Sequence, residues 1–188
     1  MKKITVRKIA KYILDFPGMS RYESYDLIAR QKYSPQIDGG RKSDKVYDRI
    51  FASDLRRGKE TARLYRSSGI EFLPELREVK FSLKNLMTKK EYEVHGSDLV
   101  RQRFVEAYVD NDLAEKRQNI KDRVVSVLKR LKRLPEGEYL LVSHSFFMKI
   151  LEIYISKGDV FKKTDLLKKY LNPLKKTYNF QEGFEFEI

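Results

Sequence analysis

The chain has 188 residues, 41% of them hydrophobic, which is enough to bury one sizeable core. Its 40 lysines and arginines outnumber 27 aspartates and glutamates, and the net charge of +13 attracts polyanions from nucleic acid to phosphorylated small molecules. Cysteine is absent, which excludes disulfides and thiolate metal sites. No apolar run approaches the roughly 20 residues that cross a bilayer. We expect one cytoplasmic domain over residues 1–188, with no signal peptide and no membrane partner.

The first strand is predicted at Ile4-Thr5-Val6, a short β-branched run. Ser20 is a predicted N-cap for a helix over residues 22–31, whose apolar side chains recur on one face. Ser34-Pro35 and Gly39-Gly40 then indicate a loop.

A second buried strand is predicted among the hydrophobic residues from Val46 to Phe51. Ser53-Asp54 offers an N-cap for a helix that we expect to continue through Tyr65. Residues 70–73 form a third candidate strand.

Weaker periodicity and many charges mark the stretch that follows. We interpret residues 79–111 as an inserted cap region, helical from Ser97 to Tyr108. The clearest helix is predicted over residues 112–134, where one apolar stripe runs the whole length, and Pro135 ends it.

Strand and helix alternate again toward the C-terminus. Residues 139–142 are predicted as a buried strand and are followed at once by a helical pattern. Residues 165–170 favour a short helix, and residues 184–188 alternate as a half-exposed strand does. This order predicts an α/β fold, specifically a three-layer α/β/α sandwich with a largely parallel sheet and an inserted cap.

His144 is the most informative single residue, because it lies where the strand at 139–142 gives way to a helix. Open α/β sheets bind ligands at the carboxyl ends of their strands, and helix N-termini favour anions. A buried histidine with one hydrogen-bond partner is the structural alternative.

Further charged residues follow other predicted strands in the same way. They occur in the segments Ile4-Thr5-Val6-Arg7, Ser53-Asp54-Leu55 with Arg57 and Thr61-Ala62, Leu76-Arg77-Glu78, and Val142-Ser143-His144. This order resembles the histidine phosphatase superfamily, also called phosphoglycerate-mutase-like, over most of the chain.

The resemblance implies roles for individual residues. Arg57 matches the phosphate-binding arginine of the family, His144 the second active-site histidine, and Glu78 the general acid. Arg7 matches the first arginine of the N-terminal Arg-His-Gly signature. Each residue taken singly also has a purely structural interpretation. Arg57 is then an arginine on the surface of a helix, Glu78 is its salt-bridge partner, and Arg7 is a capping side chain.

The chain departs from the family at the nucleophile. Lys8 stands in the position of the nucleophilic histidine, and Ile9 in that of the following glycine. A lysine amine attacks only when deprotonated, and its ordinary pKa is about 10.4. We therefore expect phosphoryl transfer to be lost or weak, leaving a pseudoenzyme.

What remains is a predicted cationic pocket in which Arg7, Lys8, Arg57 and His144 bind phosphate. We expect the partner to be a phosphorylated small molecule or a phosphopeptide, with no cofactor and no metal. One alternative is an active phosphomonoesterase in which His144 activates water and Glu78 is the acid.

A second alternative is a basic nucleic-acid-binding module, which is the less favoured hypothesis. Paired cations recur along the C-terminal half, and aromatic residues lie among the last of them, as in some single-strand binding surfaces. These residues are Lys129-Arg130, Lys132-Arg133, Lys162-Lys163, Lys168-Lys169, Lys175-Lys176, Tyr170, Tyr178 and Phe180. No recognisable nucleic-acid-binding motif accompanies them.

Overall fold

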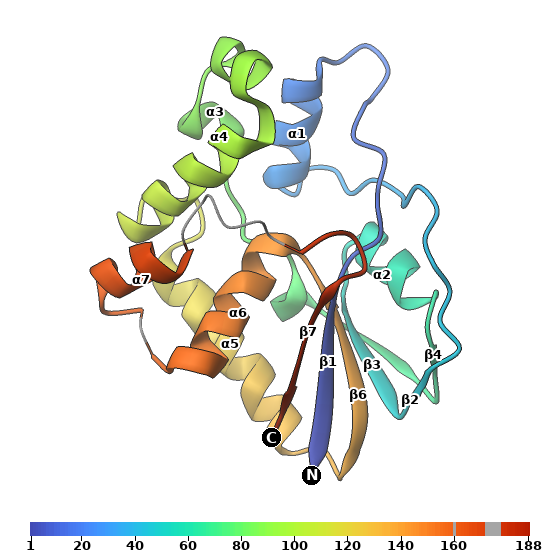
Figure 1. Ribbon diagram of the computed structural model, residues 1–188. Coiled ribbons are helices and arrows are strands. Elements are labelled where there is room, and N and C mark those ends of the chain that lie inside the picture. The colour runs from blue at the N-terminus through green and yellow to red at the C-terminus, as the bar shows by residue number, and fades with distance from the viewer. Residues whose placement is uncertain (160, 172–177) are drawn as a thin grey trace.

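A five-stranded sheet lies at the centre of the computed structural model, which describes residues 1–188 except 160 and 172–177 (Figure 1). The strand order is β5-β3-β6-β1-β7. Parallel ladders join the first four of these strands, whereas β7 runs antiparallel to β1. The strands are β1 (Lys2–Lys8), β3 (Arg49–Ser53), β5 (Ile70–Leu73), β6 (Gly137–Ser143) and β7 (Gly183–Glu187).

Helices cover both faces of this sheet. Alternate side chains of a strand point to opposite faces, and accordingly Phe51 belongs to the large core cluster and Ala52 to a smaller one. Helices α5 and α6 pack in the large cluster, and α2 in the smaller one. The predicted three-layer fold with a largely parallel sheet is therefore confirmed. The helical elements are α1 (Arg21–Ala29), α2 (Arg56–Ala62), the 3-10 turn η1 (Pro74–Leu76), α3 (Leu83–Leu86), α4 (Lys89–Val109), α5 (Arg117–Lys132), α6 (Ser145–Lys157) and α7 (Thr164–Leu171).

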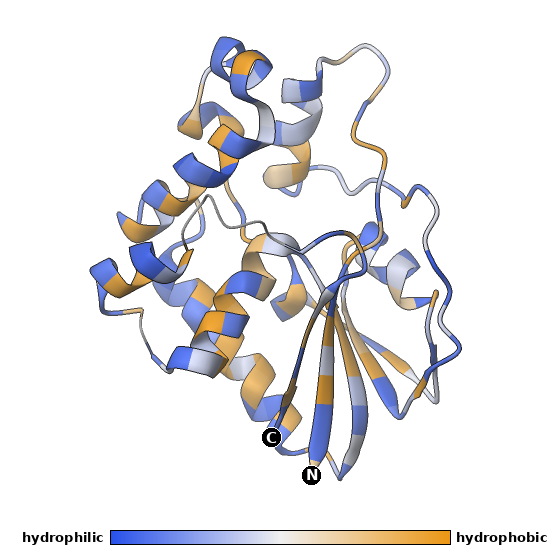
Figure 2. Ribbon diagram, in the orientation of Figure 1, coloured by the Kyte–Doolittle hydropathy of each residue, from blue (hydrophilic) through white to orange (hydrophobic). Residues whose placement is uncertain are grey.

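Hydrophobic and hydrophilic residues alternate along α5 and α7, as they do in helices with one buried face (Figure 2). Within the described part of the chain, no helix is both long enough and apolar enough to cross a membrane.

A second group of helices lies beyond the carboxyl ends of the parallel strands (Figure 1). Helices α3 and α4 come from residues 79–111, and α1 packs against both of them. Helix α4 begins well before Ser97 and contains a kink at Gly96, where φ is 57°. Glycine adopts this left-handed backbone at little cost, so the two halves of α4 take different directions.

Several predicted boundaries were wrong. Val46 lies in a separate strand, β2 (Val46–Tyr47), which pairs with β4 (Arg66–Ser67) rather than with the central sheet. Helix α2 has Leu55 rather than Ser53 or Asp54 at its N-cap position, because Ser53 still belongs to β3. The helix ends at Ala62, before Tyr65. Helix α5 starts at Arg117, although the apolar pattern begins earlier. Ser20 does cap α1, as predicted, in a reciprocal capping box with Glu23.

Asp26 attaches α1 to α3. Its carboxylate is almost fully buried and accepts hydrogen bonds from the backbone N–H of Leu83 at 2.8 Å and the hydroxyl of Ser82 at 3.1 Å. Arg30 lies 3.4 Å from the same carboxylate. A carboxylate at a helix N-terminus satisfies donors that the helix itself leaves unpaired.

We predict that Asp26→Ala lowers the free energy of unfolding by about 2–3 kcal/mol, because it leaves buried N–H and O–H groups without an acceptor. Urea denaturation followed by circular dichroism measures the change. Asp44→Ala, at an exposed loop aspartate, is the matched control and should unfold as the wild type does. Equal stability of the two variants would contradict the role given to Asp26.

Candidate functional site

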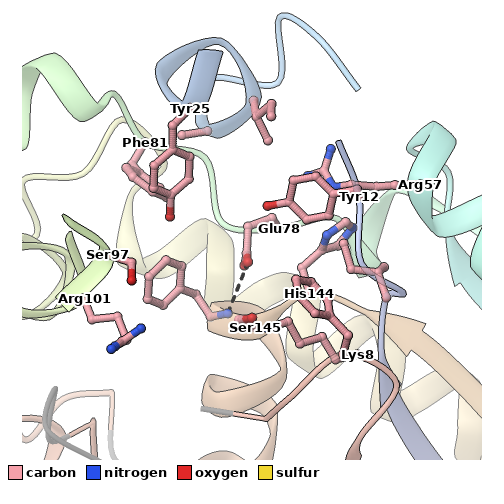
Figure 3. A pocket seen from close by; sticks show the side chains of 15 residues that line it. Lys8, Tyr12, Tyr25, Arg57, Glu78, Phe81, Ser97, Arg101, His144 and Ser145 are labelled. Carbon is pink, nitrogen blue, oxygen red and sulfur yellow. Dashed lines mark hydrogen bonds between the residues drawn. The ribbon is translucent and has the colours of Figure 1, made fainter. Parts of the chain in front are cut away.

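A cavity of about 260 Å³ lies between the carboxyl ends of the parallel strands and the helices α1 and α4 (Figure 3). Of the residues predicted to bind phosphate or to take part in catalysis, it gathers Lys8, Arg57, Glu78 and His144. These four side chains come from β1, α2, the loop after η1 and the residue before α6. The topology therefore brings together residues that are up to 136 positions apart in the sequence, counted from Lys8 to His144.

Arg57 is the least solvated cation of this site, since only 2% of it is exposed. Its Nη1 donates to the hydroxyl of Ser34 at 3.4 Å, and its guanidinium lies over the ring of Tyr12 at 5.3 Å. Its Nε is buried and has no hydrogen-bond partner among the described residues. A buried donor without an acceptor costs free energy, and an anionic ligand in the cavity would supply that acceptor.

The local sequence explains why Arg57 is held there. Thr61 accepts from the backbone N–H of Ala10 at 2.9 Å, and its hydroxyl donates to the carbonyl of Arg57 at 2.6 Å. Helix α2 also packs directly on the end of β3, since a Cβ on Gly58 would meet the carbonyl oxygen of Ser53 at 2.5 Å. The contacts of Thr61 and the close packing at Gly58 thus hold the guanidinium of Arg57 at the end of β3.

His144 is buried and is the N-cap residue of α6. Its Nε2 lies 2.9 Å from the hydroxyl oxygen of Ser53, within hydrogen-bond distance. Burial, together with the nearby charges of Arg57, Arg123 and Lys8, holds the pKa of the imidazole well below its usual range. The ring is therefore neutral at pH 7.

Glu78 is positioned by contacts on both sides of its backbone. Gln31 donates to the carbonyl oxygen of Glu78 at 2.8 Å, and Ser143 donates to that of Leu76 at 2.7 Å. The preceding residue, Arg77, forms two 2.6 Å hydrogen bonds with the carboxylate of Asp54. Such a bidentate pair fixes the loop against the end of β3.

The carboxylate of Glu78 occupies the N-terminus of α6. It accepts from the backbone N–H groups of Phe147 and Val79 at 3.0 Å and of Phe146 at 3.2 Å. Burial raises the pKa of Glu78, whereas these hydrogen bonds lower it, and the balance is a raised pKa. The helix-start amides that we expected to assist phosphate binding are thus already engaged by Glu78.

Lys8 is covered by the segment that precedes β7. Its ammonium donates to the carbonyl of Tyr178 at 3.1 Å and lies 4.5 Å from the centre of the Phe180 ring. Burial lowers the pKa of Lys8, and Arg101 lowers it further, while Glu78 and Glu182 oppose the shift. A carbonyl oxygen and a ring face thus replace part of the water around the ammonium.

Arg7 is the predicted phosphate-binding residue that the structure does not bring into the cavity. Its guanidinium lies 3.7 Å from the carboxylate of Glu185 on β7. Neighbouring residues of a strand point to opposite faces, so Arg7 and Lys8 diverge.

Several lining residues were not predicted from the sequence. Arg101 of α4 reaches the cavity, and its buried Nε has no hydrogen-bond partner in the described part of the chain. Five aromatic residues also line the walls, namely Tyr12, Tyr25, Phe81, Phe146 and Phe180. No pattern in the sequence distinguishes these residues from ordinary core or surface positions.

Other candidate features lie elsewhere. An open surface groove is lined by Lys129 and Arg130 of α5 and by Arg133 directly after it, and Arg130 pairs with Glu71 at 2.5 Å. Lys175-Lys176 lies outside the described residues. Among residues 1–159, 161–171 and 178–188, no group of three or more histidines, aspartates or glutamates is arranged to hold a metal ion.

The family model for the histidine phosphatase superfamily (branch 1) matches residues 39–165, which is more than half of the chain. The chain belongs to this superfamily. The matched range contains Arg57, Glu78 and His144. A search among curated proteins found no match.

Solved structures are similar to this superfamily member over most of its length. A candidate alpha-ribazole-5'-P phosphatase from Escherichia coli is 14% identical, with a TM-score of 0.56 over 88% of this chain and 85% of that one. A phosphoglycerate mutase from Bacillus anthracis is 18% identical, with a TM-score of 0.46 over 84% of this chain and 80% of that one. The first likeness supports the α/β fold described above.

The lowered pKa of His144 predicts how stability depends on pH. The imidazole of the unfolded chain takes up a proton near pH 6.5, the ordinary pKa of histidine, whereas that of the folded chain does not. The free energy of unfolding should therefore fall as the pH drops below 6.5, by on the order of 1 kcal/mol per pH unit from this group. Denaturant melts at pH 5.5, 6.5 and 7.5 measure the slope.

The slope should become flatter in His144→Gln, whose amide remains neutral throughout this range. Glu78 titrates in both proteins, so the difference between them isolates the imidazole. His95→Gln, at an exposed histidine of α4, is the control and should keep the wild-type slope. An unchanged slope in His144→Gln would show that the imidazole also binds a proton in the folded protein.

Proposed function

We propose that the cavity binds the phosphate group of a phosphorylated small molecule or phosphopeptide and that phosphoryl transfer there is weak or absent. The buried, unpartnered Nε of Arg57 is the observation that carries this proposal. An oxyanion is the ligand that best satisfies a guanidinium, because its oxygens accept from the donor fork in a single plane. Membership of the histidine phosphatase superfamily supports the same class of ligand.

The charges of the lining residues match a phosphate monoester. Lys8, Arg57 and Arg101 are cationic, Glu78 is the carboxylate among the lining residues, and His144 is neutral. A phosphate monoester carries about −1.5 to −2 at pH 7, which is close to the excess positive charge of these groups. Binding would thus neutralise cations that are otherwise brought together in partial isolation from water.

Weak turnover follows from the contacts that the reactive groups already make. An imidazole is neutral and nucleophilic at pH 7, whereas the amine of Lys8 is charged and engaged by Tyr178 and Phe180. Glu78, which would protonate a leaving group, has a raised pKa because it is buried, but its carboxylate oxygens are already engaged by the backbone N–H groups of Val79, Phe146 and Phe147. Ground-state binding can therefore persist without an efficient chemical step.

Arg57→Ala should weaken the binding of phenyl phosphate at least about tenfold, because it removes a charged hydrogen-bond donor from a desolvated site. Isothermal titration calorimetry of the full chain measures the affinity. Arg56→Ala is a matched control, since Arg56 is the exposed neighbour that pairs with Glu60 at 2.8 Å. Wild-type affinity in Arg57→Ala would refute the phosphate site. The basic binding module would be favoured instead if the protein bound nucleic acid, if its affinity fell steeply with salt concentration, and if Arg57→Ala left that affinity unchanged.

Lys8→His should raise hydrolysis of 4-nitrophenyl phosphate at least about tenfold, because it restores a neutral nucleophile at the end of β1. Release of 4-nitrophenol measures the rate. Lys8→Gln, which removes the amine without adding an imidazole, should stay at the wild-type level. The further change Ile9→Gly would bring the chain nearer to the family pattern, but Ile9 is buried in the core, and its loss would leave a destabilising cavity.

The alternative hypothesis of an active phosphomonoesterase predicts a different result. Wild-type turnover that is lost in His144→Gln, with no gain in Lys8→His, would favour water activation by His144 with Glu78 as the acid. The 2.9 Å contact between His144 and Ser53 argues against that route, because it engages Nε2.

A further inference from the structure

The cavity has two chemically different halves. Lys8, Arg57 and His144 form one side, at the ends of the parallel strands. Tyr25 and Phe81 lie on the other side, and the hydroxyl of Tyr25 is directed into the space between them (Figure 3). Ser97 and Arg101 lie on this second side as well (Figure 3). A ligand that fits both halves needs an anionic end and a part that packs against aromatic rings.

The apolar half is a continuous wall of rings. Tyr25 of α1 meets Phe81 edge to face, with centroids 6.3 Å apart, and Phe81 meets Phe146 of α6 in the same way at 5.8 Å. Phe146 also stacks on Phe104, with centroids 3.7 Å apart and planes within 12° of parallel. Since Phe104 covers one face of Phe146, the side of Phe146 that lines the cavity is its opposite face or its edge.

The other two lining rings have different neighbours. The guanidinium of Arg57 lies over Tyr12, and the ammonium of Lys8 over Phe180. Tyr12 and Phe180 thus shield the cations of the phosphate half. Tyr25, Phe81 and Phe146 have no such cation over their faces in the described structure, and they remain available to a ligand.

We propose that the bound phosphate monoester is a small molecule whose other part is a flat aromatic ring, seated against Tyr25, Phe81 and Phe146. This inference rests on the proposed function, because the phosphate end must first be held by Arg57. Aromatic rings attract one another in stacked or edge-to-face arrangements beyond their gain from burial alone, by about 0.5–1.5 kcal/mol per pair. An aliphatic ring of similar size gains only the free energy of burying apolar surface, without the attraction between aromatic rings.

Three probes separate these contributions in calorimetric titrations of the full chain. Inorganic phosphate tests the anionic half alone, phenyl phosphate adds a flat ring, and cyclohexyl phosphate adds an aliphatic ring with the same number of carbons. We expect phenyl phosphate to bind between about twofold and tenfold more tightly than cyclohexyl phosphate. Both esters should bind more tightly than inorganic phosphate.

Phe146→Leu tests the wall directly, because it keeps an apolar side chain but removes the ring. The preference for phenyl over cyclohexyl phosphate should fall toward unity, while the affinity for inorganic phosphate stays the same. Phe184→Leu is the matched control, since Phe184 is a partly buried ring of β7 that does not line the cavity. It should keep the wild-type preference.

A measurement on the wild-type protein covers the case in which Phe146→Leu fails to fold. Ring protons of phenyl phosphate in fast exchange should move upfield in the NMR spectrum on binding, because the protein rings shield them. If phosphate binds but the two esters bind with equal affinity, or if the upfield shift is absent, the inference of an aromatic ligand is overturned and the proposed phosphate site is not. Absence of binding by all three probes would overturn the proposed function as well.

Discussion

The carboxylate of Glu78 at the N-terminus of α6 is the contact on which the arrangement of the site depends. It joins the loop after β5 to the helix that begins beside His144, next to the hydrogen bond that Ser143 donates to the carbonyl of Leu76. The same loop is held from the opposite side by Gln31, which follows α1. The carboxylate of Glu78 thus holds the start of α6, while its backbone carbonyl holds the segment that follows α1.

This contact also decides which groups remain for a ligand. A helix N-terminus is a general anion site, but here a protein carboxylate takes it. In the proposed function, guanidinium groups hold the external anion, and Arg57 is buried with an Nε that has no partner among the described residues. The cavity therefore combines a fixed internal negative charge with cations that lack full partners, and the apolar rings opposite them limit how much water can substitute for a ligand.

The sequence predicted most of the fold because hydrophobic periodicity changes where strands pass into helices. That change located His144 correctly between β6 and α6. Periodicity does not reveal tertiary partners, however. Ser53 was predicted as a helix cap, yet its hydroxyl lies within hydrogen-bond distance of the imidazole of His144, which is 91 residues away in the sequence. Arg101 was missed because nothing in the hydrophobic pattern of its helix marks a cation that reaches the cavity, and Arg7 was misplaced because adjacent strand residues face opposite ways.

The covering of Lys8 has a consequence for how the protein folds. The carbonyl and the ring that hold the ammonium belong to Tyr178 and Phe180, and Tyr178 lies 170 positions after Lys8 along the chain. The amine therefore stays exposed to solvent until these two distant segments meet. Closure of the cationic half is thus a late, long-range event, and topologies of this kind fold slowly because distant segments must meet.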